Sequence, residues 1–422
     1  MIQTLLAVSC LATFEASPLD LLETGIMFEW SELPLMASWN ARTTVDGRPL
    51  LLYGGSDAPL PPWGSFEEVD ILSPLEAGIW GGGGWTAEFS APDIPDSSYR
   101  SAVGLLESTA GRNRYSGLLQ RPLPLGMGFG ASLGREDTIS TQLLGLERGS
   151  LSATGFLWQG PGGGDGYSAG LSYRKPWIEA GCFLASPGGE GRLAEPSAAL
   201  SAVVGRLTLE SAAGLSAWDS LTHAEAHARS TFEAGPATLV ARGDMASDSG
   251  DAEFAGTAGL LFGIPGGPGL GAGFCGMPGG VSGWIATAEW GPAGAEFFLD
   301  GSDASAGAHI TWPAWLGLSG FVSDSLLRGS VSAFPGFGFG GNGRITLGGR
   351  LVASQSDPGD GSGKVENTSA DACISLGILG FSLVGAIEDA FDDDARRMSY
   401  GIVWVFSEGP PWEPQDGDGR GS

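Results

Sequence analysis

The chain has 422 residues and a formal net charge of -27, and its 21 basic and 48 acidic side chains make up only 16% of the sequence. A soluble domain normally carries about a quarter charged residues, so this deficit indicates surface that does not face water. No cluster of Lys and Arg is present that could neutralise phosphates, which argues against a nucleic-acid partner.

The apolar residues are not gathered into helical membrane spans. The longest uncharged run, Phe254 to Ala288, is long enough to cross a bilayer as a helix, but it contains Pro265, Pro268, Pro278 and many glycines. A chain of this kind can span a membrane only as a closed β-barrel, because every backbone polar group must then be paired within the sheet.

Residues 1–16 form a short apolar stretch that resembles a secretory signal peptide, with cleavage expected after Ala12 or Ala16. Export is favoured over an ordinary N-terminal strand. The four cysteines form no Cys-x-x-Cys pair, so neither a metal cluster nor a redox motif is expected. Cys10 would leave with the signal peptide, and we interpret Cys182, Cys275 and Cys373 as small residues packed in strands.

Residues 17–96 are rich in Pro and Trp and show no steady alternation. Two stretches stand out: Thr43 to Gly55, whose Asp-Gly pair predicts a tight turn between two short strands, and Phe66 to Gly84, which ends in a glycine run. Together they resemble the plug domain of TonB-dependent outer-membrane receptors, in which a strand ends in a Val-Asp-Gly-x-Pro turn. The matching plug-turn residues are Val45, Asp46, Gly47 and Pro49.

The resemblance implies that a small ligand is carried across the outer membrane when a TonB-type energy-coupling protein pulls on an N-terminal box. The best match to that box is Glu23 to Met27. The segment is shorter than a full plug, so a degenerate plug and a working one are both open. If it is a plug, its turn and glycine run should lie inside the barrel against Arg174 and Arg242, with Glu67, Glu68 or Asp70 as carboxylate partners.

Residues 97–406 read as short strands of alternating polarity separated by Gly, Pro, Asp and Ser, which predicts an all-β fold. We expect a transmembrane antiparallel β-barrel of about 20–22 strands, possibly 16–18, with a small N-terminal plug-like segment. The side chains expected to face lipid are Tyr167, Leu171, Leu207, Leu209, Trp284, Trp290, Trp404 and Phe406. Those expected to face the lumen are Arg174, Glu210, Arg242, Asp244 and Glu289.

The last strand, Met398 to Phe406, carries three aromatic rings on a wholly apolar face. It resembles the terminal strand of bacterial outer-membrane proteins, and it should pair with the first barrel strand near Tyr99 to Ser108 because an open edge in hydrocarbon leaves backbone groups unpaired. This resemblance implies outer-membrane lipid and the barrel assembly machinery as partners. Residues 407–422, rich in Pro, Gly and Asp, are expected to be disordered.

Two polar groups raise the question of a metal. His223, Glu225 and His227 share one face of a strand and are candidate ligands for a transition metal. Residues at this spacing stand about 7 Å apart, so a polar stripe facing the lumen is the favoured interpretation. The acidic loop around Asp392 and Asp393 suggests calcium, but it lacks the alternating spacing of a calcium loop and is favoured as a solvated loop.

No Gly-x-Ser-x-Gly elbow or acid and His pairing stands out, so we expect neither an enzyme nor a cofactor. The sequence thus favours a monomeric outer-membrane barrel that takes up a small, unidentified ligand. The alternative is a passive pore, or a structural or adhesive barrel, in which residues 17–96 only fill the lumen.

Overall fold

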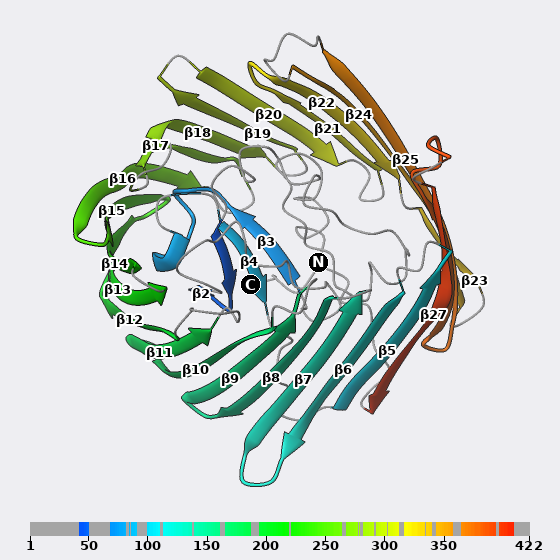
Figure 1. Ribbon diagram of the computed structural model, residues 1–422, viewed down its shortest axis with the longest axis horizontal. Coiled ribbons are helices and arrows are strands. Elements are labelled where there is room, and N and C mark those ends of the chain that lie inside the picture. The colour runs from blue at the N-terminus through cyan, green and yellow to red at the C-terminus, as the bar shows by residue number, and fades with distance from the viewer. Residues whose placement is uncertain are drawn as a thin grey trace.

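The computed structural model is an all-β closed barrel with a small sheet inside it (Figure 1). The structure describes residues 42–49, 68–81, 84, 86–90, 99–109, 113–136, 139–160, 165–186, 194–218, 221–263, 267–276, 278, 282–290, 293–301, 303–311, 316–333, 335–339, 343–357, 364–393 and 396–408. The expected signal peptide, coupling box and tail beyond residue 408 therefore lie outside the described residues, and the boundaries expected for the domains stay predictions.

The inner sheet has four short strands in the order β2-β1-β4-β3. Their bounds are β1 Arg42–Val45, β2 Arg48–Pro49, β3 Glu68–Leu72 and β4 Thr86–Ser90, and the 3₁₀ turn η4 spans Ile79–Gly81. Strand β1 pairs with β2 through the two-residue turn Asp46-Gly47, whose φ angles are 49° and 69°. Positive φ at both central residues is the geometry that a tight hairpin turn requires, so the expected Asp-Gly turn is present.

The barrel wall is formed by β5 to β27. Its first eleven strands are β5 Tyr99–Ser108, β6 Arg114–Leu123, β7 Met127–Glu136, β8 Ile139–Arg148, β9 Leu151–Gln159, β10 Asp165–Lys175, β11 Ile178–Ser186, β12 Glu195–Val204, β13 Leu207–Trp218, β14 Leu221–Ala234 and β15 Ala237–Asp248. The others are β16 Asp251–Gly263, β17 Gly269–Gly276, β18 Ser282–Trp290, β19 Ala293–Asp300, β20 Asp303–Thr311, β21 Leu316–Val322, β22 Leu326–Ala333, β23 Gly336–Phe339, β24 Gly343–Ser356, β25 Val365–Ile378, β26 Phe381–Glu388 and β27 Arg397–Glu408.

Two of these segments, β22 and β23, form one strand of the ring. Ala333 pairs with Gly349 and Gly336 pairs with Thr346, so both segments keep a single register against β24. Pro335 lies between them and has no N–H to give the ladder, although its carbonyl still accepts a hydrogen bond from the Leu347 N–H at 3.1 Å. The described wall is therefore a closed ring of 22 antiparallel strands. This count confirms the expected upper range and shows the lower alternative of 16–18 to be wrong.

The ring closes where the sequence predicts. Strand β27 pairs with β5 over ten residues, from Ser399 opposite Ser108 to Glu408 opposite Tyr99. Both ends of the barrel wall therefore meet at one rim, which we call the chain-end rim. No strand of the described ring is left with an open edge.

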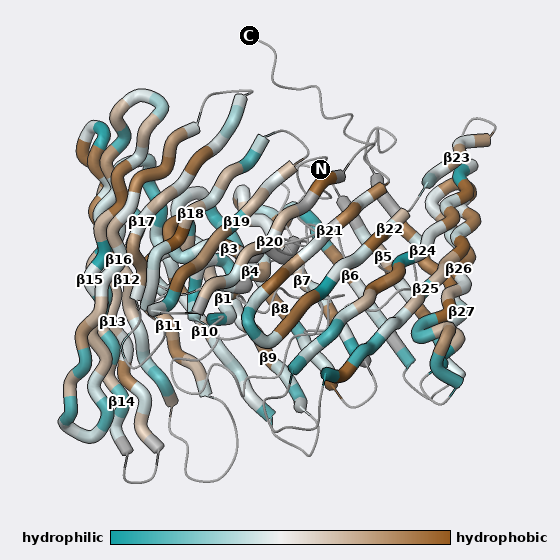
Figure 2. Tube along the Cα trace, turned by 90° about the horizontal axis from the view of Figure 1, so that it is seen from above, coloured by the Kyte–Doolittle hydropathy of each residue, from teal (hydrophilic) through white to brown (hydrophobic). Residues whose placement is uncertain are grey.

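Buried and exposed side chains alternate along many strands of the wall, as expected. Residues of high and low hydropathy are interleaved along the same strands (Figure 2). Most of the side chains predicted to face lipid are exposed, namely Tyr167, Leu171, Leu209, Trp284, Trp290 and Trp404. The side chain of Phe406 lies outside the described part, and Leu207 is half-buried. Arg242 and Asp244 are buried on the inner face, which confirms their predicted direction.

The inner face is less uniformly polar than the alternation suggests. Leu106, Val384 and Val403 point inward from β5, β26 and β27 and form one buried apolar cluster. The cluster ties the closing pair of strands to its neighbour, so part of the inner wall stabilises the barrel as an ordinary apolar core does.

Candidate functional site

The inner sheet meets the wall along β13, β14 and β15, where polar side chains alternate inward. His223, Glu225, His227 and Arg229 project from one face of β14, and Arg242 and Asp244 project from the same face of β15, since His227 stands opposite Asp244 and Arg229 opposite Arg242. The Ala residues between them on β14 point the other way. The two-residue period of the strands thus gathers six polar side chains on one patch of the inner wall.

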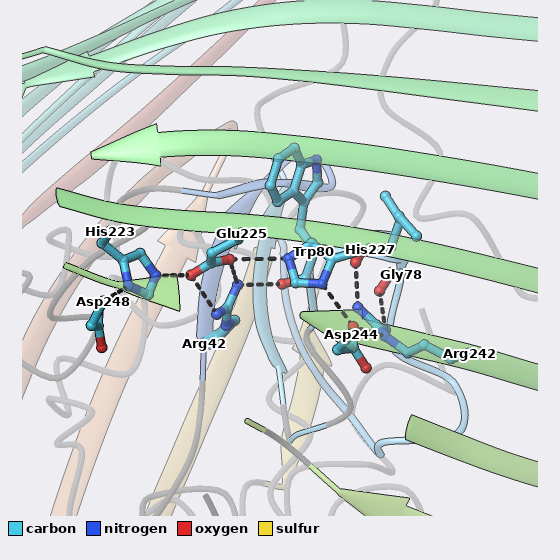
Figure 3. Close-up of polar contacts among 10 residues, drawn as sticks. Arg42, Gly78, Trp80, His223, Glu225, His227, Arg242, Asp244 and Asp248 are labelled. Atoms are coloured by element: carbon cyan, nitrogen blue, oxygen red, sulfur yellow. Dashed lines mark hydrogen bonds and ion pairs between the residues drawn. The ribbon is translucent and has the colours of Figure 1, made fainter. Parts of the chain in front are cut away.

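Glu225 is the centre of this patch (Figure 3). Arg42 of β1 donates two hydrogen bonds to it, Nη1 to Oε2 at 2.7 Å and Nη2 to Oε1 at 2.8 Å. The side chains of Arg42 and Glu225 are only 21% and 1% exposed. A bidentate guanidinium–carboxylate pair in such a place is strong and geometrically specific. It joins residues 183 positions apart in the sequence, one in the inner sheet and one in the wall.

The two imidazoles hold Glu225 from either side. His223 Nε2 lies 2.8 Å from Oε1 and His227 Nε2 lies 3.0 Å from Oε2. Their other ring nitrogens face Asp248 at 2.5 Å and Asp244 at 2.7 Å. Each ring thus bridges two carboxylates, Glu225 on one side and an aspartate on the other.

Arg242 forms the second link between wall and inner segment (Figure 3). Its Nε donates to Asp244 Oδ1 at 2.7 Å, its Nη1 donates to the Gly78 carbonyl at 2.9 Å, and its Nη2 donates to the Ile79 carbonyl. The Trp80 ring meets the His227 ring edge-on, with centroids 5.6 Å apart, and the Trp80 carbonyl accepts from Arg42 at 3.3 Å. The backbone at η4 is therefore held between Arg42 and Arg242.

A third contact lies at the predicted plug turn. Arg48, which follows Asp46-Gly47, donates to Ser172 Oγ at 2.8 Å and to Thr154 Oγ1 on the inner wall. Its guanidinium also stands 4.6 Å above the ring of Phe183. Burial is the largest effect on this group and lowers the pKa of Arg48. The side chain of Arg48 is thus positioned against the wall by the turn that contains Val45, Asp46, Gly47 and Pro49.

Glycines of the wall admit the inner segment at close range. Leu75 is fully buried, and a Cβ added at Gly259 or Gly273 would lie 2.5 Å or 3.0 Å from its Cδ2 atom. Any side chain at Gly259 would force the inner segment or β16 to shift. The apolar part of the contact between the wall and the inner segment, which we call the seam, therefore depends on two glycines, which have no side chain.

The candidate metal ligands are brought together, but in a hydrogen-bonded arrangement. Both oxygens of Glu225 already accept from Arg42 and from an imidazole, so cations of the protein occupy the positions that a metal would take. Among the residues that the structure describes, no group of three His, Cys, Asp or Glu side chains is arranged to hold a metal ion. A metal at His223, Glu225 and His227 stays a prediction.

Arg242 lies beside the glycine run as expected, and its Nη1 donates to the Gly78 carbonyl at 2.9 Å. Arg174 instead pairs with Glu179 of the neighbouring strand at 2.9 Å. The side chains of Glu67, Glu68 and Asp70 lie outside the described part, so their role as carboxylate partners stays a prediction. The acidic loop also differs from a calcium site, since the Asp389 N–H donates to Asp371 at 3.0 Å and Asp393 pairs with Arg396 at 2.5 Å.

Comparison with known proteins identifies the fold. No protein family model and no curated protein matches the sequence. Among solved structures, the open form of the ferric-catecholate import receptor Fiu from E. coli K12 matches with a TM-score of 0.62 at 8% identity, over 94% of this chain and 97% of that one. The ferric preacinetobactin receptor BauA from Acinetobacter baumannii matches with a TM-score of 0.58 at 10% identity, over 86% and 88%.

Both solved structures are receptors for iron complexes, and their fold matches the closed barrel with an inner sheet described above. The chain has the fold of a receptor-like β-barrel. At such low identity the likeness establishes the fold of this receptor-like barrel and leaves its ligand open. A closed barrel of this size with an apolar outer face is the architecture of bacterial outer-membrane proteins, and the receptor-like barrel is placed there.

Helices offer no further membrane segment within the described residues: none is long and apolar enough to cross a bilayer. Sequence reasoning found β14 as a polar inner stripe of the receptor-like barrel, but it missed Arg42 and Trp80 as its partners. The only signal for Arg42 was a cation three residues before Val45, at the start of the strand that leads into the Asp46-Gly47 turn, and a lone cation has too many possible partners for that signal to be used.

Proposed function

We propose that this barrel takes up a small ligand across the outer membrane, with energy relayed from a TonB-type protein through its N-terminal segment. The observation that carries the proposal is the way the inner segment is held. Its described links to the wall include three arginines, Arg42, Arg48 and Arg242, that bind carboxylates, hydroxyls and carbonyls. When the inner segment is displaced, water can replace the partners of polar links of this kind. Separating a large apolar core would expose apolar surface to water, at a much greater cost in free energy.

The shape of the interior supports the same proposal. A ring of 22 strands encloses far more space than side chains can fill, so an element inside it is needed to prevent free leakage. The inner sheet β1–β4 lies within the ring beside β9 to β16 (Figure 1). A displaceable inner segment gives the barrel both a closed resting state and a route for a ligand.

The alternative is a passive pore or a structural barrel in which the inner segment never moves. The acidic sequence and the absence of any identified ligand leave the ligand class open, so the test uses iron complexes of the kinds named for the structural neighbours. Cells that express the protein would be given ⁵⁵Fe-labelled ferric preacinetobactin or a ferric catecholate. We expect uptake that is lost when Glu23 to Met27 is replaced by a Gly-Ser linker and when a protonophore removes the energy source.

The matched control replaces five residues of the C-terminal tail, Gln415 to Gly419, by the same linker. Equal amounts of heat-modifiable barrel in the outer membrane would show that each variant assembles. Uptake that persists unchanged in the Glu23 to Met27 variant, or in the presence of the protonophore, would rule out energy-coupled uptake. The passive pore would then be the remaining hypothesis.

A further inference from the structure

Four consecutive hairpins of the wall each carry an exposed cation at the chain-end rim. They are the hairpins β6–β7, β8–β9, β10–β11 and β12–β13, which turn at residues 124–126, 149–150, 176–177 and 205–206. The cations are Arg121, Arg148, Lys175 and Arg206, which we call the basic arc. All four are exposed, and none forms an ion pair with any residue in the described part of the chain.

The register places three cations of the basic arc, Arg121, Arg148 and Lys175, on the lipid side of the wall. Arg121 pairs with Phe129, Arg148 with Leu151 and Lys175 with Ile178, whereas the inward positions of the same strands are neighbours such as Gln120 and Ser172. Arg206 lies in the turn after Val204. Two strands separate one hairpin from the next, so successive cations stand about 10 Å apart along the rim.

Acidic side chains of the same strands face the other way. Glu147, Glu179 and Glu210 lie on the inner face, since Glu147 stands opposite Ser152 and Glu210 opposite Arg229. Glu179 is occupied by Arg174, also at the inner side of the rim. Among the described residues of these four hairpins, the outward charges at the chain-end rim are therefore all positive.

Apolar side chains at the turns set the depth of the arc. Leu125, Leu151, Trp177 and Val204 are 60% to 77% exposed and alternate with the four cations around the rim. An exposed Trp beside Lys or Arg, at the end of an apolar surface, is the composition of a membrane–water interface. The basic arc thus lies at the level where hydrocarbon ends and lipid headgroups begin.

We propose that the basic arc binds the phosphates of anionic glycerophospholipids in the leaflet at the chain-end rim. Within the described part of the chain these guanidinium and ammonium groups form no ion pair with a carboxylate, and a phosphodiester headgroup supplies the charge and the acceptor oxygens that they lack. Each such cation near an anionic surface contributes about 1 kcal/mol, or about fivefold in lipid preference. The arc covers only β6 to β13, so it makes the barrel one-sided toward its lipids. The inference does not depend on whether the barrel transports a ligand.

The test reads bound lipid directly. The full-length barrel would be reconstituted in bilayer nanodiscs of equal parts phosphatidylglycerol and phosphatidylcholine, and the lipids retained after release would be counted by native mass spectrometry. We expect phosphatidylglycerol to be enriched severalfold over its share of the mixture. The combined variant Arg121→Gln, Arg148→Gln, Lys175→Gln and Arg206→Gln should retain the two lipids in proportion to the mixture.

The matched control is Arg135→Gln, an exposed outward arginine at the opposite end of β7, which should keep the enrichment. Heat-modifiable migration of every variant verifies that the barrel is folded. Retention of both lipids in equal amounts by the unchanged protein, or equal enrichment by the four-residue variant, would overturn the proposal. A preference for lipopolysaccharide over phosphatidylglycerol in a competing mixture would also overturn it.

Discussion

Glu225 is the residue on which the seam between wall and inner segment is most dependent. Four donor nitrogens, two from Arg42 and one each from His223 and His227, converge on its two oxygens. The nearly complete burial of its side chain removes water as a substitute partner. Loss of the carboxylate therefore leaves several charged donors facing each other without an acceptor.

Replacement of Glu225 by Gln should loosen the inner segment without unfolding the barrel. Breaking a buried ion pair from one side costs about 3 kcal/mol, and this cost falls on the inner segment because the wall keeps its own ladder. Amide hydrogen exchange at Arg42 to Val45 should accelerate by about two orders of magnitude. The control is Glu179→Gln, because its partner Arg174 is 73% exposed and such a pair contributes about 1 kcal/mol or less. Equal exchange rates in the two variants would contradict the prediction.

The direction of individual side chains was predictable and their partners were not. Alternation alone placed His223, Glu225 and His227 on one face, since a strand allows only two directions. Arg42 could not be paired with Glu225 in the same way, because the contact joins the short strand β1 to a strand far along the chain. No local pattern encodes such a contact, and only the closed ring brings the two residues together.

At the scale of elements, closure of the ring depends on both faces of β27. Its outer face carries Tyr400, Ile402 and Trp404, and the Trp404 ring meets Phe381 of β26 edge-on at 6.4 Å. Its inner face carries Val403, which is 1% exposed within the cluster with Leu106 and Val384. The sequence predicted the outer face from its aromatics, but an inner apolar cluster was not expected, because a strand buried on both faces shows no alternation to detect.

A charge placed in that cluster should prevent closure. In the variant Val403→Asp, a carboxylate without a partner would replace an apolar side chain, at a cost of several kcal/mol. We expect loss of the heat-modifiable barrel from the outer membrane. The control Met398→Asp puts the same charge on the exposed outer face at the start of β27, where the cost is about 1 kcal/mol or less. Normal amounts of folded Val403→Asp barrel would show that the cluster does not govern assembly.

The number of strands is a property of the whole molecule, because it is set by the closing of the barrel and not by any single strand. Counting of alternating segments gave a range that included 22, and the uncertainty came from neighbouring segments that could be merged into one strand. Tight two-residue turns such as Ser249-Gly250 separate strands that a coarser reading merges. The final number follows only when β27 meets β5.

The size of the ring gives the last prediction. A wall of 22 strands encloses an aqueous lumen much wider than a side chain, so whatever lies inside it controls leakage. Deletion of residues 17–96 removes the inner sheet and its links through Arg42 and Arg48, while all strands of the described ring remain. In planar lipid bilayers the deletion variant should open large, long-lived conductance steps that the full-length protein lacks.

Deletion of residues 409–422 is the control, and the conductance of its bilayer should be as low as that of the full-length protein. Conductance that is the same with and without residues 17–96 would mean that the inner segment does not close the lumen, and both the displaceable plug and the static filler would then be wrong. Large steps in the deletion variant would establish that the segment is the barrier, and the dependence of uptake on Glu23 to Met27 would then distinguish a plug that moves from a filler that stays.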